Sequence, residues 1–149
     1  IIYKSKNFSN NMVDDLSLKI DLAYGRINYK KNFSINNSLF KCEGDLNILE
    51  EYPLLFFDCS LVTNDKKKLL KKFSINIKSS NSTLKLKAKG SLNILSKKIN
   101  FYRISLNEKK IPKEDLKYLK NSFETILFNK SFLEIFETKK IKKYILDII

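Results

Sequence analysis

The sequence predicts a mainly β (α+β) protein, a curved antiparallel β-meander with amphipathic strands followed by a C-terminal helical segment. Three observations predict this class. Apolar residues alternate with polar residues over long stretches, short polar turns separate these stretches, and the apolar spacing becomes helical after Pro112. Alternation places apolar side chains on one face of a strand, and short connections join antiparallel neighbours. We therefore expect a β-sheet domain over residues 1–111, with one apolar and one polar face, and helices over 112–149.

The clearest strand is Leu84–Leu95, in which every second residue from Leu84 to Ile94 is apolar or small and lysines fill many of the positions between. A similar sequence motif occurs earlier. Phe40–Leu49 and this stretch share the pattern Lys-x-x-Gly-x-Leu-Asn-Ile-Leu. Both copies follow a Phe-Ser-Ile-Asn sequence, at Phe33–Asn36 and Phe73–Asn76. We interpret this as an internal β-repeat that covers residues 33–63 and 73–106.

The alternation assigns the remaining elements in order. Strands are expected at residues 16–22, 27–29, 33–35, 40–48, 54–62, 73–77, 84–95 and 99–106. The charged stretch 64–68 is expected to be a turn, and the apolar phase changes at Tyr102-Arg103, which predicts a β-bulge. The start of strand 54–62 is apolar on both sides, so we expect part of it to be covered on both faces. Gly44 and Gly90 lie in mid-strand on the apolar phase, where glycine marks a bend, a bulge or the close approach of another backbone.

The segment after Pro112 has the apolar spacing of a helix, with Leu116, Leu119 and Phe123 on one side. Pro112 suits the first turn, and Glu114-Asp115 suits the positive end of the helix dipole. Shorter helices are expected from Ser131 to Phe136 and from Thr138 to the end of the chain. The last one carries Ile141, Ile145 and Ile148 on one stripe, which we expect to face either the sheet or a membrane surface.

The net charge of +13 is compatible with an anionic partner. Only Arg26 and Arg103 of the 29 basic residues are arginines, whereas specific phosphate and base contacts favour arginine. Lys, Ile and Asn are all abundant, as expected of a genome rich in A and T, so we assign much of the charge to solvated faces. A nucleic-acid partner is therefore not favoured.

The composition argues against catalysis. The chain contains no histidine, which removes the commonest general base and zinc ligand. The carboxylate pairs Asp14-Asp15, Glu50-Glu51 and Glu114-Asp115 lie at expected turns or helix starts, and neighbouring strand residues point to opposite faces. We therefore predict that the protein is not an enzyme and has no metal or cofactor.

Cys42 and Cys59 are the only cysteines, and both lie on the apolar phase of strands that the turn at 50–53 would make neighbours. The favoured interpretation is two buried thiols that pack as small apolar groups. A cross-strand disulfide in an oxidising compartment is the alternative.

The recurring Lys-x-x-Gly-x-Leu-Asn-Ile-Leu phrase, set in long amphipathic strands from Phe33 to Leu106, resembles the AsmA-like proteins of Gram-negative envelopes and their relatives of the bridge-like lipid-transfer type. The resemblance implies a protein anchored in the inner membrane by an upstream helix and extending into the periplasm. It further implies a curved sheet whose apolar groove carries phospholipid for outer-membrane biogenesis or envelope integrity. Because the chain begins at Ile1, we expect it to be a C-terminal piece of a longer protein, with the anchor upstream.

The resemblance implies no catalytic residues. It implies that the apolar side chains on one face of the two repeat copies line the groove. The expected lipid-contacting residues are Phe40, Leu46, Ile48, Leu84, Leu86, Leu92 and Ile94. The expected partner is phospholipid or a membrane surface. The same residues could instead form the closed core of a structural or interaction domain, and a basic nucleic-acid-binding protein is the third interpretation.

Overall fold

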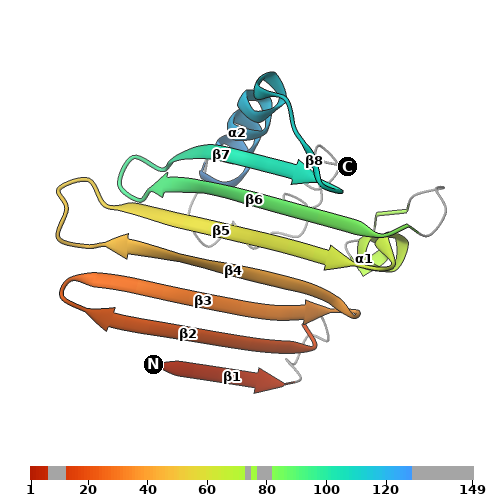
Figure 1. Ribbon diagram of the computed structural model, residues 1–149, viewed down its shortest axis with the longest axis horizontal. Helices are drawn as coiled ribbons and strands as arrows, with labels where there is room; N and C mark the ends of the chain where they lie inside the picture. Colours follow the sequence, from red (N-terminus) through yellow and green to blue (C-terminus); the bar gives the residue numbers. More distant parts are fainter. Residues whose placement is uncertain (7–12, 73–74, 77–81, 129–149) are drawn as a thin grey trace.

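The fold is a single eight-stranded sheet in which every strand pairs with its neighbours in the chain (Figure 1). The computed structural model describes residues 1–6, 13–72, 75–76 and 82–128. All seven strand pairings are antiparallel. The predicted fold class, a mainly β antiparallel meander with a C-terminal helix, is confirmed.

The elements follow one another along the sheet from one edge to the other. They are β1 (Ile2–Lys6), β2 (Asp15–Ala23), β3 (Arg26–Ile35), β4 (Ser38–Asn47), β5 (Leu54–Thr63), α1 (Lys66–Lys72), β6 (Leu84–Asn93), β7 (Lys98–Leu106), β8 (Lys109–Lys110) and α2 (Lys113–Phe128).

Tight turns with left-handed backbone conformations join several of the strands. The φ angles are +48° and +74° at Tyr24 and Gly25, and +48° and +63° at Asn36 and Asn37. Two consecutive residues of positive φ match the right-handed twist of the flanking strands, and Asn and Gly tolerate this conformation. These turns set the register between β2, β3 and β4.

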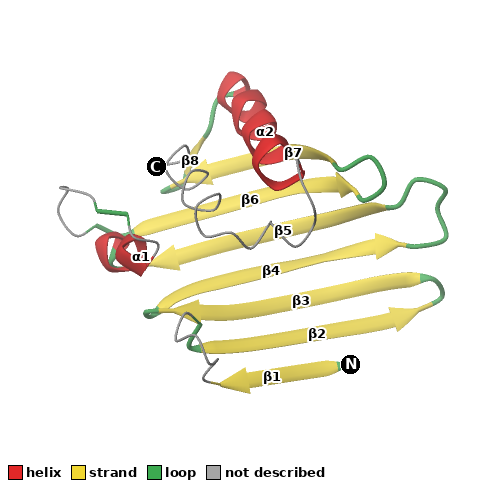
Figure 2. Ribbon diagram, turned by 180° about the vertical axis from the view of Figure 1, so that it is seen from behind, coloured by secondary structure: helices red, strands yellow, loops and turns green. Residues whose placement is uncertain are grey.

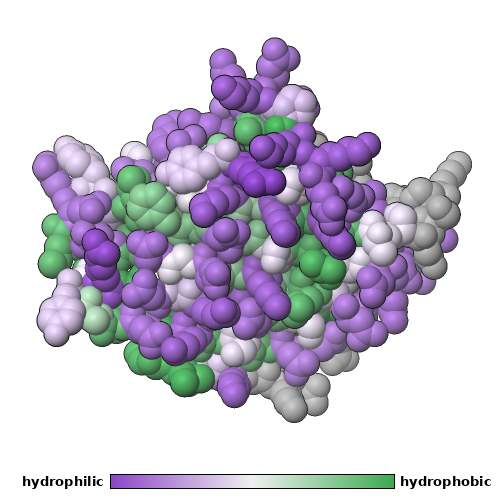
Figure 3. Space-filling model, viewed as in Figure 1, coloured by the Kyte–Doolittle hydropathy of each residue, from purple (hydrophilic) through white to green (hydrophobic). Residues whose placement is uncertain are grey.

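The two faces of the sheet differ in chemistry. The polar face, seen in Figure 3, is dominated by hydrophilic side chains. On the apolar face lies α2, which crosses the sheet beside β7 (Figure 2) and makes its main contacts with that strand. The polar side of β5 carries Phe56 and Val62, which are 38% and 39% exposed. The expectation that the start of this strand is covered on both faces is therefore wrong for Phe56.

Among the described residues, the buried apolar side chains form two groups, one near each helix. Leu69 and Leu70 of α1 are buried at the end of the sheet where β3 ends at Ile35 and β6 begins at Leu84, both also buried. There the Ser38 hydroxyl donates a buried hydrogen bond of 2.8 Å to Thr63 Oγ1. The second group contains Ile99 and Ile104 of β7 and Leu119 of α2.

The aromatic side chains Phe57, Phe101 and Phe123 connect the sheet to α2. Phe101 meets Phe57 edge-on at 6.0 Å between ring centroids and meets Phe123 edge-on at 5.8 Å. Edge-to-face contacts of this kind stabilise beyond the apolar area that they bury. The helical spacing predicted for Leu116, Leu119 and Phe123 is thus confirmed for α2.

The connection between β5 and β6 differs from the prediction. Residues 66–72 form α1 in place of a charged turn. The Asp65 carboxylate caps the helix by accepting a hydrogen bond of 2.8 Å from the backbone N–H of Lys68. Leu69 and Leu70 are buried. Ile75 and Asn76 are not in a strand, so the strand predicted at 73–77 is not formed at these two positions. The two repeat copies therefore share their long strands, β4 and β6, and differ in what precedes them.

Several other expectations have a clear outcome. The β-bulge is confirmed, because the β6–β7 register shifts where Tyr102 has no opposite residue, between the Lys89–Arg103 and Gly90–Phe101 pairs. In the described part of the chain no helix is long and apolar enough to cross a bilayer. The predicted helices at 131–136 and 138–149, with Ile141, Ile145 and Ile148, lie outside the described residues.

Candidate functional site

The apolar face contains two unbroken rows of large apolar side chains that run across six strands. Residues opposite each other on neighbouring strands share a face of the sheet. The first row is Leu16, Phe33, Phe40, Leu61, Leu86 and Leu106, and the second row is Leu22, Ile27, Leu46, Leu55, Leu92 and Ile99. We call them the first and second apolar rows.

Small residues lie between the two apolar rows in the middle of the sheet. Cys42, Cys59 and Ala88 are opposite one another on β4, β5 and β6, and Gly44 and Gly90 lie two residues further along β4 and β6. A Cβ on Gly44 would overlap the Phe56 carbonyl oxygen. A Cβ on Gly90 would overlap the Asn100 carbonyl oxygen. Of the three predicted alternatives, a bend, a bulge or the close approach of another backbone, the close approach is formed at both glycines.

Most of the predicted lipid-contacting residues come together on this face. Phe40, Leu86, Leu46 and Leu92 belong to the apolar rows and are half-buried. Leu84 shares their face but is buried, only 3% exposed, near α1. It therefore belongs to the small core at that end of the sheet.

Two of the predicted residues lie beyond the strands. Ile48 follows the end of β4 and is 49% exposed, and Ile94 follows the end of β6 and is 42% exposed. Their backbone N–H groups donate to the carbonyl oxygens of Gly25 and Pro53, respectively, within neighbouring turns. The alternating pattern continues in the sequence past the point where strand pairing stops, which is why periodicity alone placed them in the groove.

Eight further residues complete the apolar rows and were not predicted as site residues. They are Leu16, Leu22, Ile27, Phe33, Leu55, Leu61, Ile99 and Leu106. The side chain of Leu22 is 60% exposed. Its position follows from the two-residue turn at Tyr24-Gly25, which pairs Leu22 with Ile27. Turn length combined with alternation is the signal that could have found these residues.

Cys42 and Cys59 form a disulfide between β4 and β5, with 4.0 Å between their Cα atoms. The interpretation that they are free buried thiols is therefore wrong, and the alternative pairing is formed. The two cysteines are directly opposite in the antiparallel register, which brings their side chains close enough to bond. Sequence alone could not decide this, because pairing depends on the exact register between the strands.

Tyr29 of β3 lies beside this disulfide and above Gly44. Its hydroxyl is 3.9 Å from the Cys42 sulfur and donates to the Phe56 carbonyl oxygen at 3.4 Å. Burial, with a smaller contribution from the negative charge of Asp45, raises the pKa of the Tyr29 hydroxyl above 10.0. The neutral phenol is therefore the form that the fold favours.

Lys31 is a cation on the apolar face, because it lies opposite Cys42 on the neighbouring strand. Its ammonium is 5.3 Å from the ring centroid of Phe33, a cation–π distance. The side chain therefore places a positive charge next to the first apolar row.

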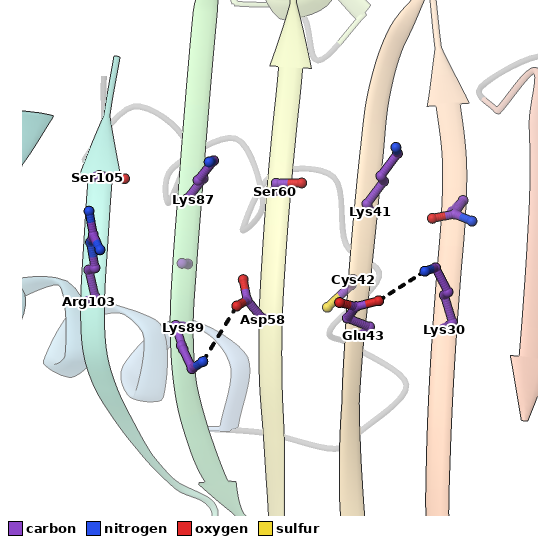
Figure 4. Close-up of a pocket in the computed structure, with 12 residues that line it drawn as sticks. Lys30, Lys41, Cys42, Glu43, Asp58, Ser60, Lys87, Lys89, Arg103 and Ser105 are labelled. Atoms are coloured by element: carbon purple, nitrogen blue, oxygen red, sulfur yellow. Dashed lines mark ion pairs between the residues drawn. The ribbon is translucent and has the colours of Figure 1, made fainter. Parts of the chain in front are cut away.

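The polar face carries a shallow depression of about 580 Å³ between β3 and β7 (Figure 4). Two ion pairs cross it, Lys30–Glu43 at 3.1 Å and Lys89–Asp58 at 3.7 Å. Over the residues that the structure describes, no three His, Cys, Asp or Glu side chains are grouped so as to hold a metal ion.

No family model, curated protein or solved structure matches this chain.

Proposed function

We propose that the chain is a non-enzymatic lipid-binding domain of a bacterial cell envelope, of the AsmA-like type, that holds phospholipid acyl chains against its apolar face. The observation that carries the proposal is the pair of apolar rows. Their members on β2 to β5 are half-buried or exposed, whereas Ile99 and Ile104 of β7, beside α2, are buried. Acyl chains on β2 to β5 would remove this apolar area from water, which is favourable by roughly 25 cal/mol per Å².

Two further features support this proposal. Lys31 can meet an anionic head group beside the first apolar row, and the net charge of +13 attracts the chain to anionic lipid surfaces. The Cys42–Cys59 disulfide is of the kind that persists in oxidising compartments such as the periplasm. We propose a periplasmic location for the domain on this basis.

A direct test uses the fact that the chain contains no tryptophan. A Leu46→Trp variant places a fluorophore on the apolar face, and a Val62→Trp variant places one on the polar face of the neighbouring strand. Both are titrated with phosphatidylglycerol that carries bromine atoms on its acyl chains. Bromine quenches only nearby tryptophan, so we expect quenching of Trp at 46 and none at 62.

A loss-of-function pair completes the test. Leu86→Asp places a carboxylate in the first apolar row, and Lys87→Asp places one on the polar face of the same strand. Native mass spectrometry should show phospholipid retained by the Lys87→Asp protein and lost from Leu86→Asp, because an unpaired charge is costly to bury. A folded, lipid-free wild-type protein, or equal quenching at both tryptophans, would contradict the proposal.

One observation favours a structural or interaction domain as the second candidate. In the described sheet β1 pairs with β2 alone, so its outer edge offers backbone groups to a partner strand. This function predicts a protein that binds a partner chain with its apolar face free of lipid.

A further inference from the structure

A row of lysines and small polar residues crosses the polar face of the sheet without a single carboxylate. The paired residues are Asn32, Lys41, Ser60, Lys87, Ser105 and Lys110, one from each strand from β3 to β8. Figure 4 shows Lys41, Ser60, Lys87 and Ser105 aligned across four strands. We call this set the lysine–serine row. Its lysines occur on every second strand, with a serine between each pair.

The neighbouring row has a different electrostatic character. It pairs Lys30, Glu43, Asp58, Lys89 and Arg103, and its two acids form the ion pairs with Lys30 and Lys89 described above. Lys41 and Lys87 are exposed and have no carboxylate partner among the described residues. The lysine–serine row is therefore a line of uncompensated positive charge.

Asn32 lies at the β3 end of the row. Its side-chain oxygen is buried at the depression and accepts no hydrogen bond from the described residues. Because this oxygen is closed off from solvent, a ligand on the polar face does not contact it, and the exposed groups of the row are its lysines.

The spacing of the row indicates the shape of the ligand. Neighbouring strands lie about 4.8 Å apart, so lysines on alternate strands repeat about every 9.6 Å. One strand spacing is close to the length of one sugar unit in an extended polysaccharide. The row then matches a chain with one acidic group per two sugars, in which a hydroxyl group of the intervening sugar meets Ser60. Ser105 is only 4% exposed and makes no such contact.

Other polyanions match less well. Nucleic-acid phosphates are much more closely spaced, with a rise of about 3.4 Å along one strand of a duplex, and single strands bind through stacking on aromatic rings, which the row does not contain. A planar anionic membrane would meet Glu43 and Asp58 as well as the row. Only a linear ligand can follow the lysines and avoid the acids.

We propose that the lysine–serine row binds a linear acidic polysaccharide that carries one carboxylate per disaccharide, laid across the strands. This activity is separate from lipid binding, because it uses the opposite face of the sheet. A domain with both activities would hold lipid on one face and an acidic glycan on the other.

The probe for the test is an end-labelled hyaluronan decasaccharide, a linear polymer with one carboxylate per disaccharide. Fluorescence anisotropy measures its binding to the full chain at fixed ionic strength. The test variant is Lys41→Gln/Lys87→Gln. The matched control is Lys67→Gln/Lys71→Gln, which removes the same charge from exposed positions on α1.

We expect the row variant to raise the Kd about tenfold, the effect of losing two exposed charge contacts, and the control to leave it within about threefold. Circular dichroism should show the same thermal unfolding for both variants, because all four lysines are exposed. If both variants lost the same affinity for the decasaccharide, binding would depend on net charge alone, and the proposal would be overturned. Absence of binding would also overturn it, as would tighter binding of an oligothymidylate or of phosphatidylglycerol vesicles at equal charge.

Discussion

The Glu124 carboxylate of α2 accepts a hydrogen bond of 2.8 Å from the backbone N–H of Ile99 on β7. β8 pairs only with the far end of β7, so this bond satisfies a backbone donor on the uncovered part of the last long strand. The second carboxylate oxygen lies 3.4 Å from Lys98 Nζ. The helix therefore both covers β7 and protects its edge from pairing with another chain.

Replacing Glu124 with alanine should lower the free energy of unfolding by about 1–3 kcal/mol, because it leaves the Ile99 N–H without its acceptor. Lys98→Ala serves as the control. It removes only an ion pair whose lysine is 68% exposed, and we expect a loss below about 1 kcal/mol that high salt abolishes. Urea unfolding in low and high salt measures both. Equal losses in the two variants would show that the backbone hydrogen bond adds nothing.

The two mid-strand glycines should not tolerate even a methyl group. A Cβ on Gly44 or Gly90 would overlap a carbonyl oxygen of the adjacent strand, and backbone has little freedom to move away. We expect Gly44→Ala and Gly90→Ala each to destabilise the protein by about 1–3 kcal/mol. Ser60→Ala, on the polar face of β5, is the control and should be close to neutral. Unchanged urea midpoints for both glycine variants would contradict the close approach.

Opening the Cys42–Cys59 disulfide should destabilise the sheet. The two cysteines are 17 residues apart, and closing a loop of this size stabilises by about 3 kcal/mol in the chain-entropy description. A Cys42→Ala/Cys59→Ala variant and the reduced wild type should therefore unfold at similarly lowered urea concentrations. A reducing agent should not shift the variant, which controls for other effects. An unshifted wild type under full reduction would contradict this prediction.

Alkaline pH should destabilise the protein through Tyr29. The raised pKa of its hydroxyl means that the folded state favours the neutral phenol. This contribution is complete below the unfolded value of 10.0, and it is lost as the pH rises through the higher pKa of the folded state. Tyr29→Phe should therefore weaken the decrease in stability that begins above pH 10.0. Tyr24→Phe, at a fully exposed position, should leave that decrease unchanged. Urea unfolding at a series of alkaline pH values measures the free energy of unfolding. Identical pH profiles for the two variants would refute the prediction.

Local patterns in the sequence predicted most of the sheet. The period of two in β2, β4, β6 and β7 follows from strand geometry, in which successive side chains point to opposite faces. The bulge at Tyr102 was predicted for the same reason, because an extra residue must shift the apolar phase. The helical spacing of Leu116, Leu119 and Phe123 predicted α2. Each of these signals lies within one element, so no knowledge of neighbouring strands was needed.

Long-range packing decided what the local pattern could not. Residues 66–72 are mostly lysine and read as a solvated turn, but α1 forms because Leu69 and Leu70 are buried at the end of the sheet. The side chains of Ile48 and Ile94 continue the alternating pattern, but the strands end before them. Burial and strand ends depend on residues distant in the chain.

The amino-acid sequence by itself determined which residues lie on each face, because alternation is a property of the extended backbone. Only the tertiary structure decided which residues are opposite one another, because register arises from turn geometry and strand pairing together. That register joins Cys42 to Cys59, aligns the apolar rows on one face and lines up the lysine–serine row on the other. Both candidate sites are properties of this register, which no single strand contains.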